Sequence, residues 1–368
     1  MKPIVSFCIP VYNNAEGAVK IVNSLLSSQD KRFEVVVSDD NSSDNVGELL
    51  SGIHDERFRY FRNEKNLGAH KNWEHSLELG RGEWLCLIMG RDMMQGQNIT
   101  TLIERLIYAH ENNITFLKDM GPERKGFSVS EGIDAMINFV TYNHPTGCIF
   151  RADIFREIPN RTRYFEISDM YPEVYVIRDL LLKGKGAYIH SGACFGGYAT
   201  DKAKVKSTVE RNTNIYDTYF APARRTKQFY ELIDMIESDL LGVFTASELD
   251  RFFKAKYTFF LENVSYWWRV WCRDPVQMAH YRQPVRYIGI PEMVRNMIQG
   301  YHDTKTHLQE KGTYTPSRRR IMLRSTAKTM IHISAKSIIR SIIEPLGIWK
   351  ILHCMRHNKH LSNKIEGI

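Results

Sequence analysis

Three apolar runs in the first 92 residues each end in polar or acidic residues, and this placement constrains the fold more than any other feature. Residues 4–9 lead into Pro10-Val11-Tyr12-Asn13, residues 33–37 into Ser38-Asp39-Asp40, and residues 84–89 into Gly90-Arg91-Asp92. Separated by helical patterns, such runs predict parallel strands of an open α/β sheet. Ligands bind these sheets at the carboxyl ends of the strands, so we expect a site at that edge.

The remaining chain divides into three regions by pattern. Strand and helix patterns alternate to about residue 206, apart from residues 121–130, whose polar, glycine-containing sequence predicts a loop. Residues 208–299 are rich in aromatic residues and helix formers and lack clear strand runs. We therefore expect an α/β domain over residues 1–206, a helical domain over 207–315 and a helical tail over 316–368.

The tail carries all of the net positive charge. The chain has 50 Lys and Arg against 42 Asp and Glu, and residues 316–368 hold 11 of the basic and 2 of the acidic residues. The remainder therefore has 39 basic and 40 acidic residues and is nearly neutral. Basic residues or histidine recur every fourth position from Arg320 to Arg340. This pattern suits a helix on an anionic membrane surface, and it also suits a basic helix docked on its own protein.

Cysteine usage and hydropathy indicate a cytoplasmic protein. The six cysteines are scattered without a CxxC pair, and Cys8 and Cys86 lie in apolar runs, which favours a reducing compartment. The N-terminus lacks the layout of a signal peptide. We expect no transmembrane segment, because no apolar run approaches the roughly 20 residues that a bilayer requires.

Four motifs, in the same order along the chain, resemble those of inverting family 2 glycosyltransferases, which have a GT-A fold. The motifs are Pro10-Val11-Tyr12-Asn13, Asp39-Asp40-Asn41-Ser42, Asn66-x-Gly68 with Asn72-Trp73, and Gly90-Arg91-Asp92. The resemblance covers about residues 3–200. It implies a Rossmann-like, mostly parallel sheet flanked by helices, and a nucleotide diphosphate sugar as donor.

The resemblance implies donor contacts at the strand ends. Tyr12 can stack on the base, and Asp40 matches the family position whose carboxylate accepts from a ring N–H. Asp39 is equally well explained as a turn or capping residue. Further candidates for donor contacts are Pro10, Asn13, Asn72, Arg91 and Gly147, the last because glycine lets backbone approach a sugar closely.

The resemblance also implies a divalent cation, although this chain has fewer acidic residues in the relevant motif than the family does. The family motif that follows the strand predicted at residues 84–89 contains two or three aspartates, whereas this chain has Gly90-Arg91-Asp92. Asp92 matches the position that contacts Mg²⁺ or Mn²⁺, and His190 is the candidate for a late histidine ligand. Arg91 can itself contact a phosphate or ribose.

Inversion at an anomeric carbon needs one general base. The family base lies 11 residues before the glycine that closes its helix, and counting back from Gly184 gives Glu173. We expect the N-terminus of the helix to keep Glu173 ionised. Asp169 is the rival for this role.

The sequence thus predicts a glycosyltransferase that moves a sugar, most simply from a UDP-sugar, to a glycan or lipid-linked glycan acceptor in bacterial surface polysaccharide synthesis. Peripheral attachment to the inner face of the membrane through the tail is part of this hypothesis. One alternative is a degenerate, non-catalytic GT-A protein that binds nucleotide or glycan. A nucleotidyltransferase is the other, although residues 10–15 lack the glycine and basic residue of its loop. No motif indicates a nucleic acid partner.

Overall fold

The protein forms two compact units, Met1–Glu210 and Arg211–Ile368, in a computed structural model. The structure describes residues 2–90, 92–120, 127–141, 144–167, 171–194, 222–273 and 290–343. Candidate residues Arg91 and Asp169 lie outside these ranges.

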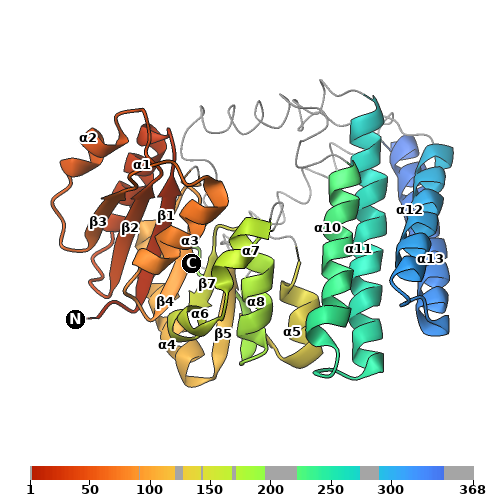
Figure 1. Ribbon diagram of the computed structural model, residues 1–368. Helices are drawn as coiled ribbons and strands as arrows, with labels where there is room; N and C mark the ends of the chain where they lie inside the picture. Colours follow the sequence, from red (N-terminus) through yellow and green to blue (C-terminus); the bar gives the residue numbers. More distant parts are fainter. Residues whose placement is uncertain are drawn as a thin grey trace, which may run out of the picture. The chain divides into compact units, whose positions relative to one another are not determined.

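The first unit is built on an eight-stranded mixed sheet of order β3-β2-β1-β4-β7-β5-β8-β6 (Figure 1). The strands are β1 (Val5–Val11), β2 (Phe33–Asp39), β3 (Phe58–Arg62), β4 (Trp84–Leu87), β5 (Ile114–Asp119), β6 (Phe127–Ser130), β7 (Cys148–Arg151) and β8 (Lys185–Ile189). β1 pairs in parallel with both β2 and β4, and β2 pairs in parallel with β3. β7 is antiparallel to β4 and β5, and β6 is antiparallel to β8.

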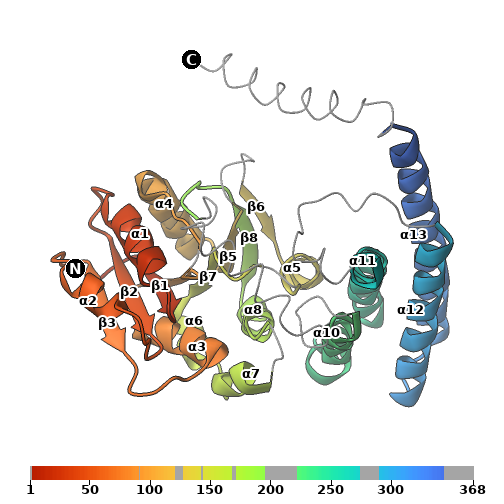
Figure 2. The same ribbon diagram turned by 90° about the horizontal axis from the view of Figure 1, so that it is seen from above.

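Helices cover both faces of this sheet. They are α1 (Ala15–Leu26), α2 (Val46–Ser51), α3 (Ala69–Leu79), α4 (Ile99–Glu111), α5 (Gly132–Phe139), α6 (Ala152–Glu157), α7 (Arg161–Ile167) and α8 (Glu173–Leu181), with a 3-10 turn, η1, at Gly96–Asn98. Figure 2 shows α1 and α4 on one face and α3, α6 and α8 on the other. Every residue of β1 and β2 is therefore buried, as continuous apolar strands of a doubly covered sheet should be.

α1 illustrates how sequence periodicity produces this layering. Ala18, Ile21, Val22 and Leu25 recur at helical spacing and are fully buried against the sheet. Its polar residues remain outside, where Lys20 pairs with Glu16 across one helical turn.

One predicted loop is partly a strand. Residues 121–126 lie outside the described ranges, but Phe127–Ser130 form β6 at the edge of the sheet, paired with β8. The strand is short and half-exposed, so its sequence lacks the apolar run that identifies a buried strand.

The second unit is helical. It contains α10 (Pro222–Met235), a π-helical turn η2 (Ile236–Leu240), α11 (Ala246–Arg273), α12 (Ile290–Glu310) and α13 (Pro316–Ile343). α11 contacts α10, α12 and α13, and aromatic residues such as Phe229, Phe252, Tyr257 and Phe260 fill the core between the helices. The first part of the predicted tail therefore packs within this unit as α13.

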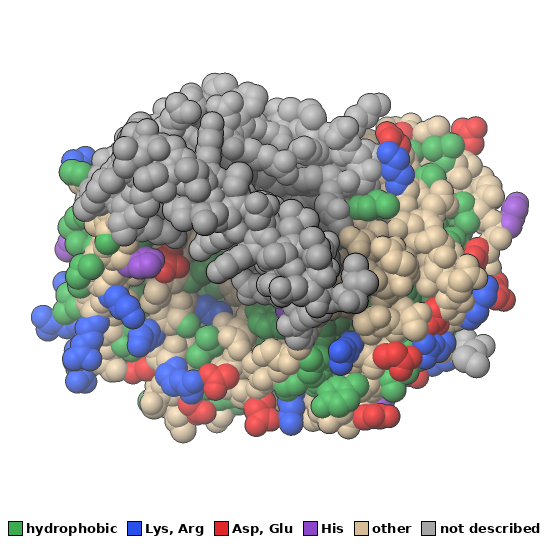
Figure 3. Space-filling view, turned by 180° about the vertical axis from the view of Figure 1, so that it is seen from behind, with side chains coloured by type: hydrophobic (Ala, Val, Ile, Leu, Met, Phe, Trp, Pro, Cys, Tyr) green, Lys and Arg blue, Asp and Glu red, His purple; other side chains and the backbone are tan. Residues whose placement is uncertain are grey.

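Figure 3 shows Lys and Arg side chains interspersed with Asp and Glu on the described part of one face. None of the helices in the described part of the chain has the length and apolarity that a bilayer crossing requires.

Candidate functional site

The carboxyl ends of β1, β2 and β4 lie at one edge of the sheet, as the sequence predicted. Val11 pairs with Asp39, and the amide of Asp40 donates to the Val11 carbonyl at 2.8 Å. On the other side of β1, a Cβ added to Gly90 would lie 3.0 Å from the Pro10 carbonyl oxygen. Tyr12 follows β1 at this edge with half of its side chain exposed, so a flat aromatic surface is available for a ligand.

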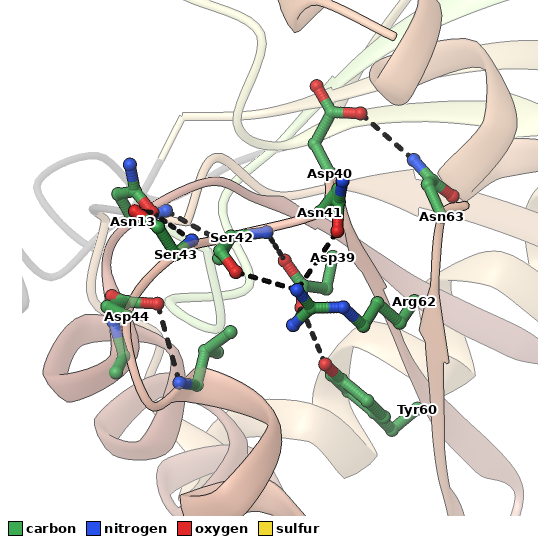
Figure 4. A network of polar contacts seen from close by, with 12 residues as sticks. Asn13, Asp39, Asp40, Asn41, Ser42, Ser43, Asp44, Tyr60, Arg62 and Asn63 are labelled. Atoms are coloured by element: carbon green, nitrogen blue, oxygen red, sulfur yellow. Dashed lines mark hydrogen bonds and ion pairs between the residues drawn. The ribbon is translucent and has the colours of Figure 1, made fainter. Parts of the chain in front are cut away.

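A polar network joins the segments that follow β1 and β2 (Figure 4). The Asn13 amide donates to Ser42 Oγ at 2.9 Å, and the Asn13 side-chain oxygen accepts from the Ser43 amide at 2.8 Å. Asp44 accepts from the Ala15 amide at 2.9 Å and so caps the first turn of α1. Asn13 thus fixes the backbone beside Tyr12 rather than presenting its side-chain oxygen outward.

Asp39 has a structural environment. Its carboxylate is fully buried and accepts from the Tyr60 hydroxyl at 2.6 Å and the Ser42 amide at 2.9 Å, and Arg62 lies at 3.3 Å (Figure 4). Burial, together with the charge of Asp39, raises the pKa of Tyr60 to about 12. These contacts favour the interpretation of Asp39 as a turn residue.

Asp40 joins the end of β2 to the turn before α3. Its carboxylate accepts from the amides of Leu67 at 2.7 Å and Gly68 at 3.0 Å and from the side chain of Asn63 at 3.0 Å. Gly68 has φ +83°, a conformation that favours glycine, so this residue lets the turn close on the carboxylate. Three of about four acceptor positions on the carboxylate are occupied by these donors, and Asp40 is 2% exposed.

Two further donor-binding candidates are buried. Pro10 lies inside β1, and Asn72 of α3 is 2% exposed. The Asn72 side chain donates to the Ser38 carbonyl at 3.1 Å and accepts from the Ser38 hydroxyl at 2.7 Å, which attaches α3 to β2. The structure therefore gives Asn72 a role in holding the site's framework.

Asp92 lies against the loop before β7. The Thr146 hydroxyl donates to Asp92 Oδ2 and accepts from the Met89 amide at 2.9 Å, and His144 Nε2 lies 3.6 Å from the same Asp92 oxygen. Gly147 continues this loop with φ +82°, and a Cβ there would lie 2.8 Å from the Asp119 carbonyl oxygen. Glycine is thus required at position 147 by the backbone and by its neighbour.

Lys118 was not among the residues that the sequence singled out. It ends an otherwise apolar run in β5, is 5% exposed, and donates through Nζ to the His144 carbonyl and to the Thr146 carbonyl at 2.7 Å. It therefore fixes the loop that contacts Asp92. The available signal was a lysine at the carboxyl end of a buried strand, where charged residues are rarely tolerated without partners.

Glu173 begins α8 and is 2% exposed. Neither carboxylate oxygen has a hydrogen-bond partner among the described residues. Burial raises the pKa of Glu173 to about 8, and the residue's own backbone amide and the charge of Lys118 only partly oppose this effect. The expectation that the helix N-terminus keeps Glu173 ionised is therefore wrong, because loss of hydration outweighs the favourable amide and charge.

Metal binding rests on few ligands. Within the described ranges, no group of three or more His, Cys, Asp or Glu side chains is arranged to hold a metal ion. The loop that starts at His190 reaches the segment after Asp92, since the Ala193 carbonyl accepts from Gln95 N at 2.9 Å and the Gly192 carbonyl from Asn98 at 2.9 Å. Asp92 supplies a carboxylate of the kind that Mg²⁺ uses when diphosphate and water complete its coordination.

Comparison with known proteins identifies the family that the first part of the chain matches. Residues 6–114 match the model of Glycosyl transferase family 2, and they run from the second residue of β1 through β4 and include Tyr12, Asp40 and Asp92. These residues belong to glycosyltransferase family 2. The mixed sheet flanked by helices and the helical second unit confirm the predicted GT-A α/β fold with a helical C-terminal region.

Curated relatives of this glycosyltransferase domain match over a limited segment. The GalNAc(5)-diNAcBac-PP-undecaprenol beta-1,3-glucosyltransferase of Campylobacter jejuni is 28% identical over 131 residues, which are 34% of this chain and 42% of that protein. The abequosyltransferase RfbV of Salmonella typhimurium is 34% identical over 95 residues, 24% of this chain and 28% of that protein. Each match spans less than half of the relative's own length.

Among solved structures, S. aureus TarS 1-349 in complex with UDP-GlcNAc is similar to this chain. The sequence identity is 16% and the TM-score 0.43, over 85% of this chain and 93% of that structure.

Proposed function

We propose that the chain is an inverting glycosyltransferase that moves a sugar from a nucleotide diphosphate donor, most simply a UDP-sugar, to a glycan hydroxyl. The observation that carries the proposal is that the family 2 segment brings Tyr12, Asp40 and Asp92 to adjoining strand ends at one sheet edge. The relatives named as a glucosyltransferase and an abequosyltransferase support sugar transfer.

The nucleotide end of the site is the rim beside Tyr12. The exposed phenol ring offers a stacking surface for a base, and the remaining acceptor position of Asp40 suits a ring N–H. Because Asp40 is already fixed by two amides and an asparagine, it needs little reorganisation to bind the base.

The diphosphate end is the segment around Asp92. Asp92, with His190 as the candidate second ligand, would hold a divalent cation, which would neutralise charge on the leaving diphosphate. Lys118 is buried and positions the His144–Thr146 backbone. Its substitution should therefore displace the loop beside Asp92.

Glu173 is our candidate for the general base that takes the proton of the acceptor hydroxyl. With its pKa raised to about 8 by burial, its ionised form is a stronger base than an ordinary carboxylate and becomes populated as the pH approaches 8. Asp169 remains the rival for this role. One proton passes to Glu173 as the acceptor oxygen bonds to the anomeric carbon, and the nucleotide diphosphate leaves with the electron pair of the broken C–O bond.

The acceptor that we propose is a lipid-linked glycan of a bacterial surface polysaccharide, used at the inner face of the cell membrane. One relative is named for a polyprenol-linked acceptor.

The test is turnover with a defined donor. Full-length protein is screened by thermal shift against UDP-, GDP- and dTDP-sugars with Mn²⁺, and donors that raise the Tm are assayed for released nucleotide diphosphate with a lipid-linked acceptor. We expect a UDP-sugar to stabilise the protein, and E173Q to retain donor binding and lose transfer. Donor binding without turnover in the wild type would favour the non-catalytic alternative, which the Gly90-Arg91-Asp92 motif also suits.

A further inference from the structure

The exposed face of α13 carries two adjacent rows of side chains. We call Arg320, Arg324, Lys328 and His332 the basic row, and Leu323, Ala327 and Ile331 the apolar row. All seven residues are exposed, and the large side chains Leu323 and Ile331 are 48% and 71% exposed. Positions four apart are neighbours on a helix, and each step of four turns by about 40°, so both rows wind slowly around the exposed side of α13.

The opposite face of α13 fixes the rotation of the helix. Met322, Ser325, Thr326 and Thr329 are buried, and Thr326 Oγ1 lies 2.9 Å from the hydroxyl of Tyr257 in α11. Arg318, at the start of the helix, pairs with Glu237 at 2.5 Å. The two exposed rows therefore point away from the core of this unit because specific contacts hold them there.

The charge of this face is not balanced within the helix. Residues 316–343 contain no Asp or Glu, whereas residues 1–315 are nearly neutral. A row of three guanidinium or ammonium groups beside exposed leucine and isoleucine suits a surface that is anionic at the headgroups and apolar just beneath them.

We infer that this face of α13 binds an anionic phospholipid bilayer. The helix lies in the plane of the membrane, with the apolar row at the boundary of the acyl chains and the basic row on the phosphates. A nucleic acid fits less well, because neither row has a Phe, Tyr or Trp side chain to stack on bases and the apolar row would remain without a contact. The inference concerns binding alone and does not depend on sugar transfer.

The experiment is co-sedimentation of the full-length protein with vesicles of phosphatidylcholine alone or with 30% phosphatidylglycerol. Each Lys or Arg near an anionic surface raises the membrane partition coefficient about fivefold, so R320Q/R324Q/K328Q should bind the anionic vesicles roughly 100-fold more weakly than wild type. We expect L323S/I331S to lose roughly tenfold or more on the same vesicles, because two apolar side chains no longer enter the boundary. High salt should weaken binding of the wild type.

The matched control removes three positive charges from exposed positions of other helices of the same unit. K227Q/K254Q/R295Q has the same net charge as the basic-row variant and should bind within a few-fold of wild type. Circular dichroism and gel filtration confirm that each variant is folded. Equal loss in the control, unchanged binding of either row variant, or binding to duplex DNA in place of vesicles would overturn the inference.

Discussion

The buried carboxyl of Glu173 predicts a specific dependence of stability on pH. Its pKa is raised from 4.5 to about 8 by burial, so between these values the unfolded chain ionises while the folded protein keeps the proton. The folded state therefore binds more protons, and stability falls as the pH rises. A pKa difference of this size opposes folding by about 4–5 kcal/mol above pH 8, since each unit is worth about 1.4 kcal/mol.

Replacing Glu173 with glutamine removes this ionisation. We expect E173Q to match the wild type near pH 5 and to exceed it by about 4–5 kcal/mol in free energy of unfolding near pH 9. The assay is urea-induced unfolding at pH 5, 7 and 9. E48Q, which removes an exposed carboxyl of α2, is the control and should follow the wild-type profile. Parallel pH profiles for E173Q and wild type would refute the reasoning about burial.

Three further outcomes follow from the site. If Glu173 is the base, kcat/KM should rise with pH, reach half of its plateau near pH 8 and level off above about pH 9, and a flat profile from pH 6 to 9 would remove it from that role. G147A should lower the free energy of unfolding by roughly 2–4 kcal/mol, because its Cβ would lie 2.8 Å from a backbone oxygen and its φ is unfavourable for alanine. G132A has an unfavourable φ but open space around its Cβ, so it should cost only about 1 kcal/mol in thermal unfolding. D40A should cost roughly 3–6 kcal/mol in urea unfolding through three lost hydrogen bonds, while D153A, which removes an exposed ion pair, should change stability by less than about 1 kcal/mol.

Local pattern was sufficient for the framework of the first unit. The apolar runs that form β1, β2 and β4 are continuous, and each is followed by polar residues, so the shared edge could be predicted before any contact was known. β6 could not, because a short polar edge strand is defined by its pairing with β8 rather than by its own residues.

The environment of individual polar residues depends on contacts that pattern does not encode. Lys118 reaches the loop before β7 only because β5 pairs with β7, and that pairing joins residues about 30 positions apart. The position of a residue in a motif also does not reveal whether its polar group faces a ligand or its own chain. Asn72, for example, forms its hydrogen bonds with Ser38. The burial of Glu173 likewise arises from tertiary packing, which reversed the expected direction of its pKa.

The most direct test of the central claim is calorimetric titration of UDP, with Mn²⁺, into wild-type protein and Y12A. Tyr12 is half-exposed beside the strand ends, so its removal should leave the Tm nearly unchanged. Loss of base stacking is worth about 1–3 kcal/mol, which corresponds to a Kd raised roughly 5- to 150-fold. Equal Kd values for the two proteins, or no binding of UDP to the wild type, would contradict a nucleotide site at this edge of the sheet.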